Sequence, residues 1–182
     1  MSGHSKWSQI KHKKAETDEK RGKLFSKISR LISVSTKEGG TDPTANPKLK
    51  LAIEKAKEVN MPYDNIEKAI KKGSGMAEKG GLEEITYEAY GPSGAAIIIE
   101  TVTNNKNRTV NEIKHILSQF DAKISTSGSA LWAFEKKDDK WQSKHQIHEI
   151  SENDKIKLKN LLEALENHDD VQNVITNSKP VA

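Results

Sequence analysis

The sequence predicts an α+β protein in which a three-helix lobe precedes a two-layer α/β sandwich with a mainly antiparallel sheet. Apolar residues recur with a helical period as far as residue 73, a glycine-rich segment follows at 74–81, and beyond it apolar and polar residues alternate as in a strand. Helical and strand patterns are thus segregated along the chain, which is typical of α+β folds. We place a basic helical domain at 1–75 and the sandwich domain at 76–182.

The N-terminal lobe begins with a polar, basic segment. In segment 5–23 the only large apolar residues are Trp7 and Ile10, so this segment is expected to form an arm or a weak helix that needs another surface to lie on. Apolar residues at 24–32 then fall on one face of a helix, which the glycine pair at 39–40 ends. This pattern predicts the first strong helix.

Two more helices complete the predicted helical lobe. Asn46-Pro47 supplies an N-cap and a proline at the first helical position, and the helical period continues to a break at 60–62. Asp64 and Glu67 have the spacing of a capping box at the start of the third helix, which Gly73 is expected to end.

The second lobe is predicted to open with a β-hairpin. Alternation at 85–89, a turn at 91–94 and an apolar run at 95–102 give two strands, the second of them buried. Thr109 with Glu112 has another capping-box spacing, which predicts the start of a helix on the sheet. The remaining expected elements are strands at 122–125, 130–135 and 141–150, a helix around 158–165 and a closing strand at 171–175.

The composition indicates thin cores and excludes several kinds of chemistry. The chain of 182 residues is 34% hydrophobic and 31% charged, against roughly 45–50% apolar and about 25% charged residues in average domains. It contains no cysteine, which rules out disulfides, thiolate metal sites and thiol nucleophiles. No stretch approaches the roughly 18 apolar residues of a membrane span, so we expect a cytoplasmic protein with no membrane partner.

The charge is unevenly distributed between the two lobes. The net charge is +4, but residues 1–75 carry 17 Lys or Arg against 9 Asp or Glu, while residues 76–182 carry 13 against 17. Such a change of sign suggests that the basic half meets a polyanion. The alternative is a lysine-rich genome, since 27 of the 30 cations are lysine.

The densest basic segment is predicted to hold a nucleic-acid backbone. Between positions 6 and 30, ten basic or titratable side chains accompany only three carboxylates. Lysine contacts to phosphates release counterions and give salt-sensitive binding without sequence preference. The alternative is a solvated helix face. The residues assigned to nucleic-acid binding are Lys6, Trp7, Lys11, His12, Lys13, Lys14, Lys20, Arg21, Lys23, Lys27, Arg30, Lys71 and Lys72.

Arginine is scarce, which argues against strong base-specific readout. Only Arg21, Arg30 and Arg108 occur, although arginine makes the commonest specific contact with guanine and lysine acts more as a point charge. Recognition of the backbone or of shape is therefore favoured. Trp7 either stacks on a base or pins the basic segment to its own domain.

The loop 103–109 is a candidate for a secondary phosphate-binding site. Free N–H groups at a helix start, together with Lys106 and Arg108, could hold a phosphate. Alternatively, the asparagines of this loop only form turns and Thr109 only caps the helix.

The sequence does not indicate an enzyme. The six histidines lack the HExxH spacing, no Gly-x-Ser-x-Gly elbow occurs, and the glycine-rich stretches lack the pattern of a phosphate-binding loop. The acidic pairs Asp138-Asp139 and Asp169-Asp170 are expected in polar loops. We therefore predict no catalytic residue, no metal site and no cofactor.

Ten short strings, in order over nearly the whole chain, carry a resemblance to a known family. In the first lobe they are Gly3-His-Ser-Lys-Trp7, Ile10-Lys-His-Lys-Lys14, Lys20-Arg-Gly-Lys23, Asn60-Met-Pro62, Asp64-Asn-Ile-Glu67 and Ala69-Ile-Lys-Lys-Gly73. In the second lobe they are Tyr87-Glu-Ala-Tyr-Gly-Pro92, Asn107-Arg-Thr109, Thr126-Ser-Gly-Ser129 and Asp169-Asp-Val-Gln-Asn-Val174. Together these strings resemble the YebC/PmpR family.

The resemblance implies a cytoplasmic, non-enzymatic regulator of gene expression that binds DNA as a transcriptional regulator. Relatives such as the mitochondrial translational activator of cytochrome c oxidase subunit I imply instead a ribosome-associated translation factor that binds rRNA or tRNA. Both implications place the N-terminal lobe near nucleic acid. We expect a monomer whose partner is DNA or ribosomal RNA, with the whole ribosome as a further candidate.

The chain departs from the family pattern in one large respect. Family members usually carry a further small α/β domain near 136–146, and here only a polar connection remains. Smaller departures are Ala89 and Ser93, where the family favours glycine, and Asn104 and Lys106, where it favours Asp and Arg.

Overall fold

The computed structural model describes residues 6–75, 81–138, 140–147 and 149–178, with the backbone alone for residues 6–16. The chain divides into two compact units, Met1–Ala77 and Glu78–Ala182, which we call unit 1 and unit 2. Within the described residues, no helix combines the length and the apolar character that a membrane crossing needs.

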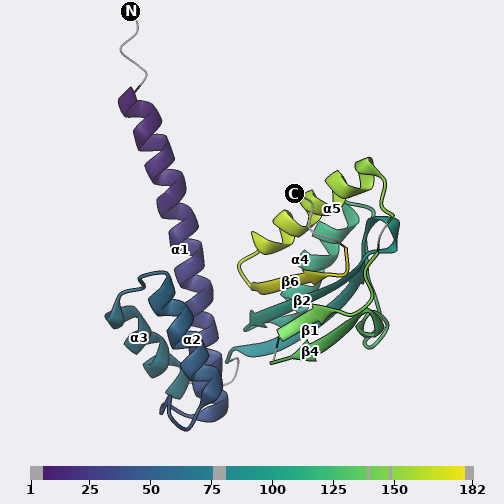
Figure 1. The fold of residues 1–182 in the computed structure, drawn as a ribbon. Helices are drawn as coiled ribbons and strands as arrows, with labels where there is room; N and C mark the ends of the chain where they lie inside the picture. The colour runs from purple at the N-terminus through teal and green to yellow at the C-terminus, as the bar shows by residue number, and fades with distance from the viewer. Residues whose placement is uncertain (1–5, 76–80, 139, 148, 179–182) are drawn as a thin grey trace, which may run out of the picture. The chain divides into compact units, whose positions relative to one another are not determined.

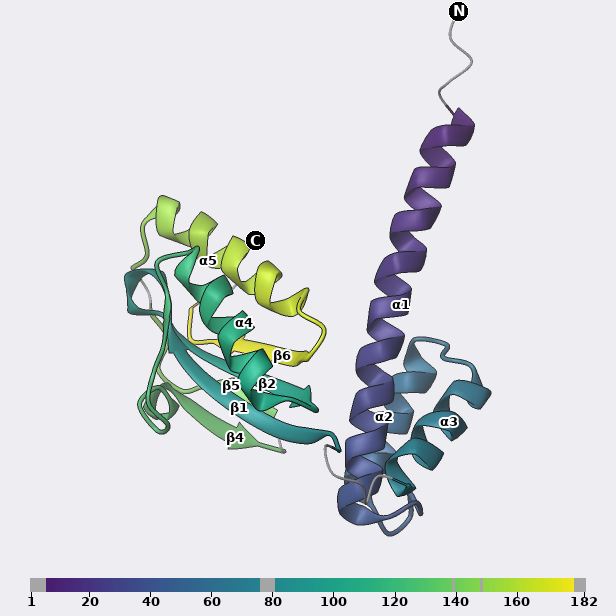
Figure 2. The same ribbon diagram turned by 180° about the vertical axis from the view of Figure 1, so that it is seen from behind.

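Unit 1 is built from three helices, α1 (Lys6–Gly39), α2 (Pro47–Glu58) and α3 (Tyr63–Ser74). The basic segment and the helix predicted from residue 24 are one continuous helix. Figures 1 and 2 both show the N-terminal half of α1 extending well beyond α2 and α3, which lie beside its C-terminal half. The predicted three-helix arrangement is therefore confirmed, and the basic segment is helical.

The core of unit 1 lies where the three helices meet. α3 approaches α1 closely because Gly73 has no side chain. A Cβ at Gly73 would lie 2.4 Å from the carbonyl oxygen of Ser33 and 2.8 Å from Cβ of Thr36. The Ser33 hydroxyl also donates to the carbonyl oxygen of Ala69 at 2.8 Å. The buried apolar side chains of this core are Ile28, Ile32, Leu49, Ala52, Ala56, Met61, Ile66 and Ala69.

Asn46 caps α2 as the sequence predicts. Its side-chain oxygen accepts a hydrogen bond from the Leu49 N–H at 3.1 Å. Its amide group donates to the carbonyl oxygens of Ser35 at 2.8 Å and Gly40 at 2.9 Å. One buried side chain thereby joins the end of α1 to the start of α2.

Two expectations for α3 are wrong. The helix begins directly after Pro62, and the capping position makes no side-chain hydrogen bond, so Asp64 lies inside the first turn instead of capping it. The fixed φ of proline suits the entry to a helix, and α3 begins there without a side-chain cap. Gly73 does not end the helix, which continues to Ser74. Instead, Gly73 allows α3 to lie in close contact with α1.

The described part of unit 2 is organised around one antiparallel sheet with the strand order β3-β1-β2-β6. In Figure 1 the two helices lie on one face of this sheet, and the β4–β5 hairpin lies on the other. The elements in chain order are β1 (Glu83–Tyr90), η1 (Pro92–Gly94), β2 (Ala96–Thr103), α4 (Lys106–Ser118), β3 (Lys123–Ile124), η2 (Leu131–Ala133), β4 (Phe134–Lys137), β5 (Lys140–Ser143), α5 (Glu152–Glu166) and β6 (Val171–Thr176).

Strand β2 is buried on both faces, as its unbroken apolar run predicts. Ile97 and Ile99 belong to the core beneath α4 and α5. Ile98 points the other way and packs with Ala133 and Phe134 of η2 and β4. The predicted α+β class, with helices packed on a mainly antiparallel sheet, is confirmed, and the hairpin adds cover on the second face.

The start of α4 differs from the prediction. The cap is Asn105, whose side-chain oxygen accepts a hydrogen bond from the Arg108 N–H at 3.1 Å. Thr109 lies buried inside the helix, so Thr109 and Glu112 do not form a capping box. An asparagine three positions before Arg108 is as good a cap as threonine, and it starts the helix earlier.

The strand predicted at 141–150 is shorter than expected. It ends at Ser143 as β5, and beyond it the described residues form a single parallel bridge between Ile147 and Ser178. The polar residues after Ser143 offer no alternating apolar face that a longer strand would bury.

Two glycines inside helices allow a test of the packing in unit 1. At Gly22 of α1, a Cβ would meet nothing within 4 Å, so Gly22→Ala should stabilise the protein by about 0.5–1 kcal/mol through reduced backbone entropy. Gly73→Ala should destabilise it by about 1–3 kcal/mol or more, because α3 must move away from α1. Urea unfolding followed by circular dichroism measures both changes. Equal effects of the two substitutions would contradict the close contact at Gly73.

Candidate nucleic-acid interface

One side of α1 carries a row of cations. Lys20, Lys23, Lys27 and Arg30 follow one another at intervals of three, four and three residues. These intervals place all four on one side of a helix, turned largely away from the side that packs in the core. Lys20 and Lys23 are exposed, while Lys27 and Arg30 are half-buried. We call these four residues the basic row.

The other predicted members on α1 lie differently or cannot be placed. The Arg21 guanidinium lies 5.2 Å from the centre of the Phe25 ring, away from the basic row. Within the row, Lys23 Nζ lies 3.5 Å from a Glu19 carboxylate oxygen, a surface pair of small energy. The side chains of Lys6, Trp7, Lys11, His12, Lys13 and Lys14 lie outside the described residues, and their roles stay predictions.

Lys71 and Lys72 bring two further cations to unit 1 from α3. Both are exposed and immediately precede Gly73, the residue that touches α1 at Ser33. Arg30 stands three residues before Ser33 on α1. The last turn of α3 therefore lies beside the stretch of α1 that contains the end of the basic row. Cations in a last turn also suit the negative end of the helix dipole.

In the predicted secondary phosphate site, Arg108 is already paired with carboxylates of unit 2. Arg108 Nη2 lies 2.7 Å from Asp170 Oδ2, and Arg108 Nε lies 3.8 Å from Glu112 Oε2. The hydrogen bond to Asp170, and then the charge of that carboxylate, raise the pKa of Arg108 above its ordinary value. The guanidinium thus already has an anion beside it, while Lys106 is an exposed cation of the same helix start. Phosphate binding by this pair stays a prediction.

Asp170 is the centre of this arrangement. It is only 2% exposed, and its Oδ2 also accepts a hydrogen bond from the Thr109 hydroxyl at 2.6 Å. Its backbone oxygen accepts from the Val102 N–H at 2.8 Å. The residue therefore joins β2, the start of α4 and the segment before β6.

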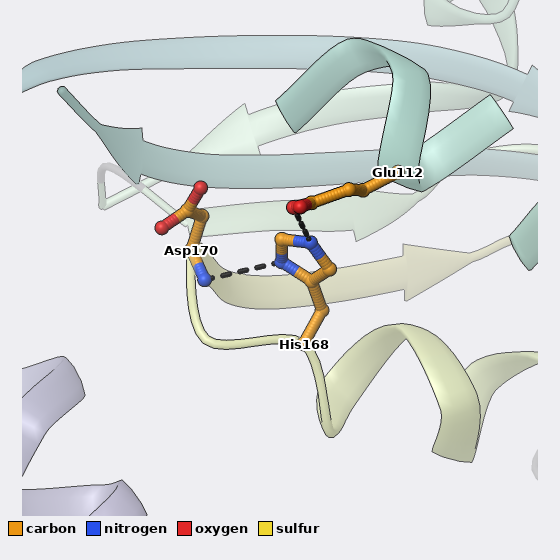
Figure 3. A group of neighbouring side chains, drawn as sticks. All are labelled: Glu112, His168 and Asp170. Carbon is orange, nitrogen blue, oxygen red and sulfur yellow. Dashed lines mark hydrogen bonds and ion pairs between the residues drawn. The ribbon is translucent and has the colours of Figure 1, made fainter. Parts of the chain in front are cut away.

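Figure 3 shows Glu112, His168 and Asp170 gathered near the start of α4. One potential ligand atom of each lies within 4.8 Å of the others, a spacing that a metal ion could bridge. However, the Asp170 N–H donates to His168 Nδ1 at 3.1 Å, which leaves Nε2 of the neutral ring to donate to Glu112 Oε2 at 2.8 Å. Both ring nitrogens are engaged in this way, so we assign the group a bracing role.

A buried carboxylate holds the loop between β3 and η2. Glu88 on β1 is 5% exposed and accepts hydrogen bonds from three backbone N–H groups of the loop. The donors are Gly128 at 2.5 Å, Ala130 at 2.7 Å and Leu131 at 3.2 Å. An ionised carboxylate with several N–H donors is well satisfied although it is buried.

An exposed tryptophan follows this loop. Trp132 is 56% exposed, and its indole N–H donates to the Tyr90 hydroxyl at 2.9 Å. The Tyr90 hydroxyl in turn donates to the carbonyl oxygen of Ser129 at 2.5 Å. The His145 ring lies beside the indole, with ring centres 5.7 Å apart and 30° between the planes.

The sequence did not predict the buried pairing of Asp170 or the exposed, hydrogen-bonded indole of Trp132. Asp170 does lie in the turn before β6, but it is buried, and adjacent acidic residues give no sign of a partner 62 positions away. One available signal was that the strings 107–109 and 169–174 belong to the same family pattern, and these strings meet at Asp170. In the same way, the strings 87–92 and 126–129 meet through Glu88 and Tyr90.

Comparison with known proteins assigns the chain to a family. Residues 5–76 match the family model for the TACO1/YebC protein N-terminal domain, and residues 82–139 match the model for the TACO1/YebC second and third domain. The chain belongs to the TACO1/YebC family. The resemblance seen in the sequence is thereby confirmed. The second match ends inside the segment 136–146, where the extra domain is predicted to be missing, and that absence stays a prediction.

Curated relatives are similar to this TACO1/YebC protein in sequence. It is 51% identical over 158 residues to a probable transcriptional regulatory protein of Natranaerobius thermophilus, across 87% of this chain and 63% of the relative. It is 54% identical over 137 residues to one of Chlorobium chlorochromatii, across 75% of this chain and 55% of the relative. The chain therefore spans less than two thirds of the length of these relatives.

A solved structure supports the fold of this TACO1/YebC protein. The crystal structure of a conserved hypothetical protein from Aquifex aeolicus superposes on it with a TM-score of 0.83 and is 31% identical in sequence. The superposition covers 92% of this chain and 94% of the other.

The Arg108–Asp170 pair should stabilise unit 2. Arg108→Met keeps the apolar stem but leaves the buried carboxylate of Asp170 without its cation, so we expect a loss of about 1–3 kcal/mol in the free energy of unfolding. Lys106→Met, at an exposed position two residues earlier, is the matched control and should change the stability by less than about 0.5 kcal/mol. Chemical denaturation measures both. Similar values for the two variants would rule out a bracing role for Arg108.

The Glu112–His168–Asp170 group should not respond to metal ions. Because both nitrogens of His168 are engaged, added Zn²⁺ or Mn²⁺ should leave the unfolding temperature unchanged in a thermal-shift assay. His168→Ala serves as the control for nonspecific effects of the metal. A rise in unfolding temperature that His168→Ala removes would show that the group does bind a metal.

Proposed function

We propose that this TACO1/YebC protein is a cytoplasmic, non-enzymatic regulator of gene expression that binds duplex DNA, acting as a monomer. The basic row of α1 contacts the phosphate backbone, assisted by Lys71 and Lys72 of α3. The regulatory role is supported by the names of the curated relatives, which are probable transcriptional regulatory proteins. A measured interaction with DNA is the decisive test of this proposal.

The observation that carries the proposal is that the basic row continues, along α1, the lysine-rich segment that projects beyond α2 and α3. α1 has 34 residues, and at 1.5 Å per residue it is about 51 Å long. Its C-terminal half supplies the core of unit 1, while Figures 1 and 2 show its N-terminal half without cover from α2 or α3. Over its full length α1 carries ten Lys or Arg against four Asp or Glu. A long basic helix of this kind suits a polyanionic partner.

A ribosome-associated translation factor is the second candidate. It is favoured by the makeup of the basic row, which contains three lysines and one arginine. Lysine neutralises phosphates as a point charge and does not read base edges well, so the row suits structured RNA as much as an operator sequence. In this case the contacted backbone would be rRNA or tRNA.

Charge removal on the basic row tests the proposal. In the variant Lys20→Gln/Lys23→Gln/Lys27→Gln, each substitution removes one cation and keeps a good helix former. We expect weaker binding to duplex DNA and a salt slope that is shallower by roughly one unit for each phosphate that is no longer neutralised. Binding should be measured for a promoter duplex, a random duplex and purified ribosomes at two salt concentrations.

The matched control removes the same charge from another helix. Lys50, Lys55 and Lys57 are exposed on α2, and their triple change to Gln should leave binding nearly unchanged. Equal losses in both triple variants would show that only net charge matters, which contradicts a site on α1. Preference for the promoter duplex supports transcriptional regulation, whereas retention on ribosomes in excess duplex supports the second candidate.

A further inference from the structure

We infer that unit 2 carries a second nucleic-acid contact, in which one unpaired nucleobase of a single strand stacks on Trp132. This inference rests on the proposed function and adds to it a separate site with a different chemistry. The basic row neutralises phosphates, whereas Trp132 offers a flat aromatic surface. The site is distinct from the braced group at Asp170.

The indole ring of Trp132 is held in place although it is exposed. Its polar edge is satisfied by the Tyr90 hydroxyl at 2.9 Å, and Tyr90 is itself bonded to the backbone of Ser129. The loop that contains Ser129 is fixed by the buried carboxylate of Glu88. An aromatic ring that is already ordered loses little conformational entropy when a ligand stacks on it.

Packing inside unit 2 does not use the exposed face of Trp132. The core under the β4–β5 hairpin includes Ala133, Phe134 and the partly buried Trp141, but not Trp132. The two tryptophans of this region therefore differ: Trp141 packs against the core, while Trp132 remains 56% exposed. A single exposed apolar side chain is common on protein surfaces. Trp132 differs from such a side chain because its indole is held by a hydrogen bond and lies near lysine-bearing segments, which suits a ligand that can stack.

The His145 ring lies beside the indole of Trp132, and two lysines belong to neighbouring segments of the chain. The backbone N–H groups of Lys144 and His145 both donate to the carbonyl oxygen of Ala133, at 2.8 Å and 3.2 Å, so these two residues lie next to the turn that contains Trp132. Lys123 is paired with Tyr90 across β1 and β3, which places both side chains on the same face of the sheet. Lys123, Lys144 and His145 are exposed.

The positions of Lys123 and Lys144 matter because unit 2 as a whole is acidic. Residues 76–182 carry 13 Lys or Arg against 17 Asp or Glu. Lysines beside an aromatic ring match the two parts of a nucleotide, since the base stacks on the ring while the flanking phosphates meet the cations. Because every base has an aromatic face, the site should bind single strands with little sequence preference.

The test uses the full chain and single-stranded oligonucleotides of about ten nucleotides, oligothymidylate and oligouridylate. With Trp7→Phe and Trp141→Phe in the background, Trp132 is the only tryptophan, and stacking should quench its fluorescence in a saturable way. In the chain with its native tryptophans, Trp132→Ala should lower the affinity about tenfold, whereas Trp132→Phe, which still stacks, should stay within about threefold of the unsubstituted protein.

Two controls come from the same unit. Ile156 is 60% exposed on α5, so Ile156→Ala removes a similarly exposed apolar side chain away from the site and should leave the affinity unchanged. Lys123→Gln/Lys144→Gln should make the salt slope shallower by roughly 0.7 for each phosphate that is no longer neutralised. Lys114→Gln/Lys159→Gln, which removes the same charge from exposed positions of α4 and α5, should not.

The outcomes separate this inference from the proposed function. No quenching, together with an unchanged affinity in Trp132→Ala, overturns the stacking site even if the basic row still binds duplex DNA or ribosomes. Loss of a protein partner in Trp132→Ala without any change in oligonucleotide binding overturns it as well. Quenching that persists in Lys20→Gln/Lys23→Gln/Lys27→Gln supports an independent site on unit 2, whatever the fate of duplex binding.

Discussion

The burial of β2 on both of its faces is the constraint on which unit 2 depends. Ile97 and Ile99 require cover from α4 and α5, and Ile98 requires cover on the opposite face. Each fully buried isoleucine contributes about 1.5–3 kcal/mol relative to an exposed one. A sheet with a single covered face would leave Ile98 in water, so the β4–β5 hairpin is part of the core. The turn η2, which brings Ala133 and Phe134 over Ile98, is also what turns Trp132 outward.

The two halves of α1 differ in what they contribute to unit 1. The C-terminal half of α1 packs against α2 and α3, and it is held there by the close contact at Gly73 and by the three hydrogen bonds of Asn46. The N-terminal half has almost no apolar side chains, so its helical conformation is supported by continuation from the packed half.

The sequence predicted the features that depend on local periodicity. The helical spacing at 24–32, the cap at Asn46 and the buried run at 95–102 all correspond to elements of the structure. Where two residues competed for one local role, the prediction chose wrongly: Pro62 preceded Asp64 at one helix start, and Asn105 preceded Thr109 at another. Local spacing cannot rank such neighbours, because a helix begins at the first position that satisfies its N–H groups or tolerates their exposure.

The candidate site was predictable only in part, for a different physical reason. The density of lysines between 6 and 30 is a local property, and the helical spacing of Lys20, Lys23, Lys27 and Arg30 follows directly from it. The partner of Arg108 and the exposure of Trp132 depend on contacts between residues about 40 to 60 positions apart. Periodicity carries no information about those contacts, so they were found only in the folded chain.

The order of the strands has a consequence for synthesis of the protein. β2 pairs with β1 through a short turn, but its other neighbour, β6, begins about 70 residues later. At a synthesis rate of about 5–20 residues per second, the free edge of β2 waits roughly 4–14 seconds for its partner. During that interval the apolar face of Ile97 and Ile99 also lacks α5. The nascent chain is thus exposed to aggregation between the completion of its hairpin and the arrival of its last strand, and this period is when a chaperone would be of most use to it.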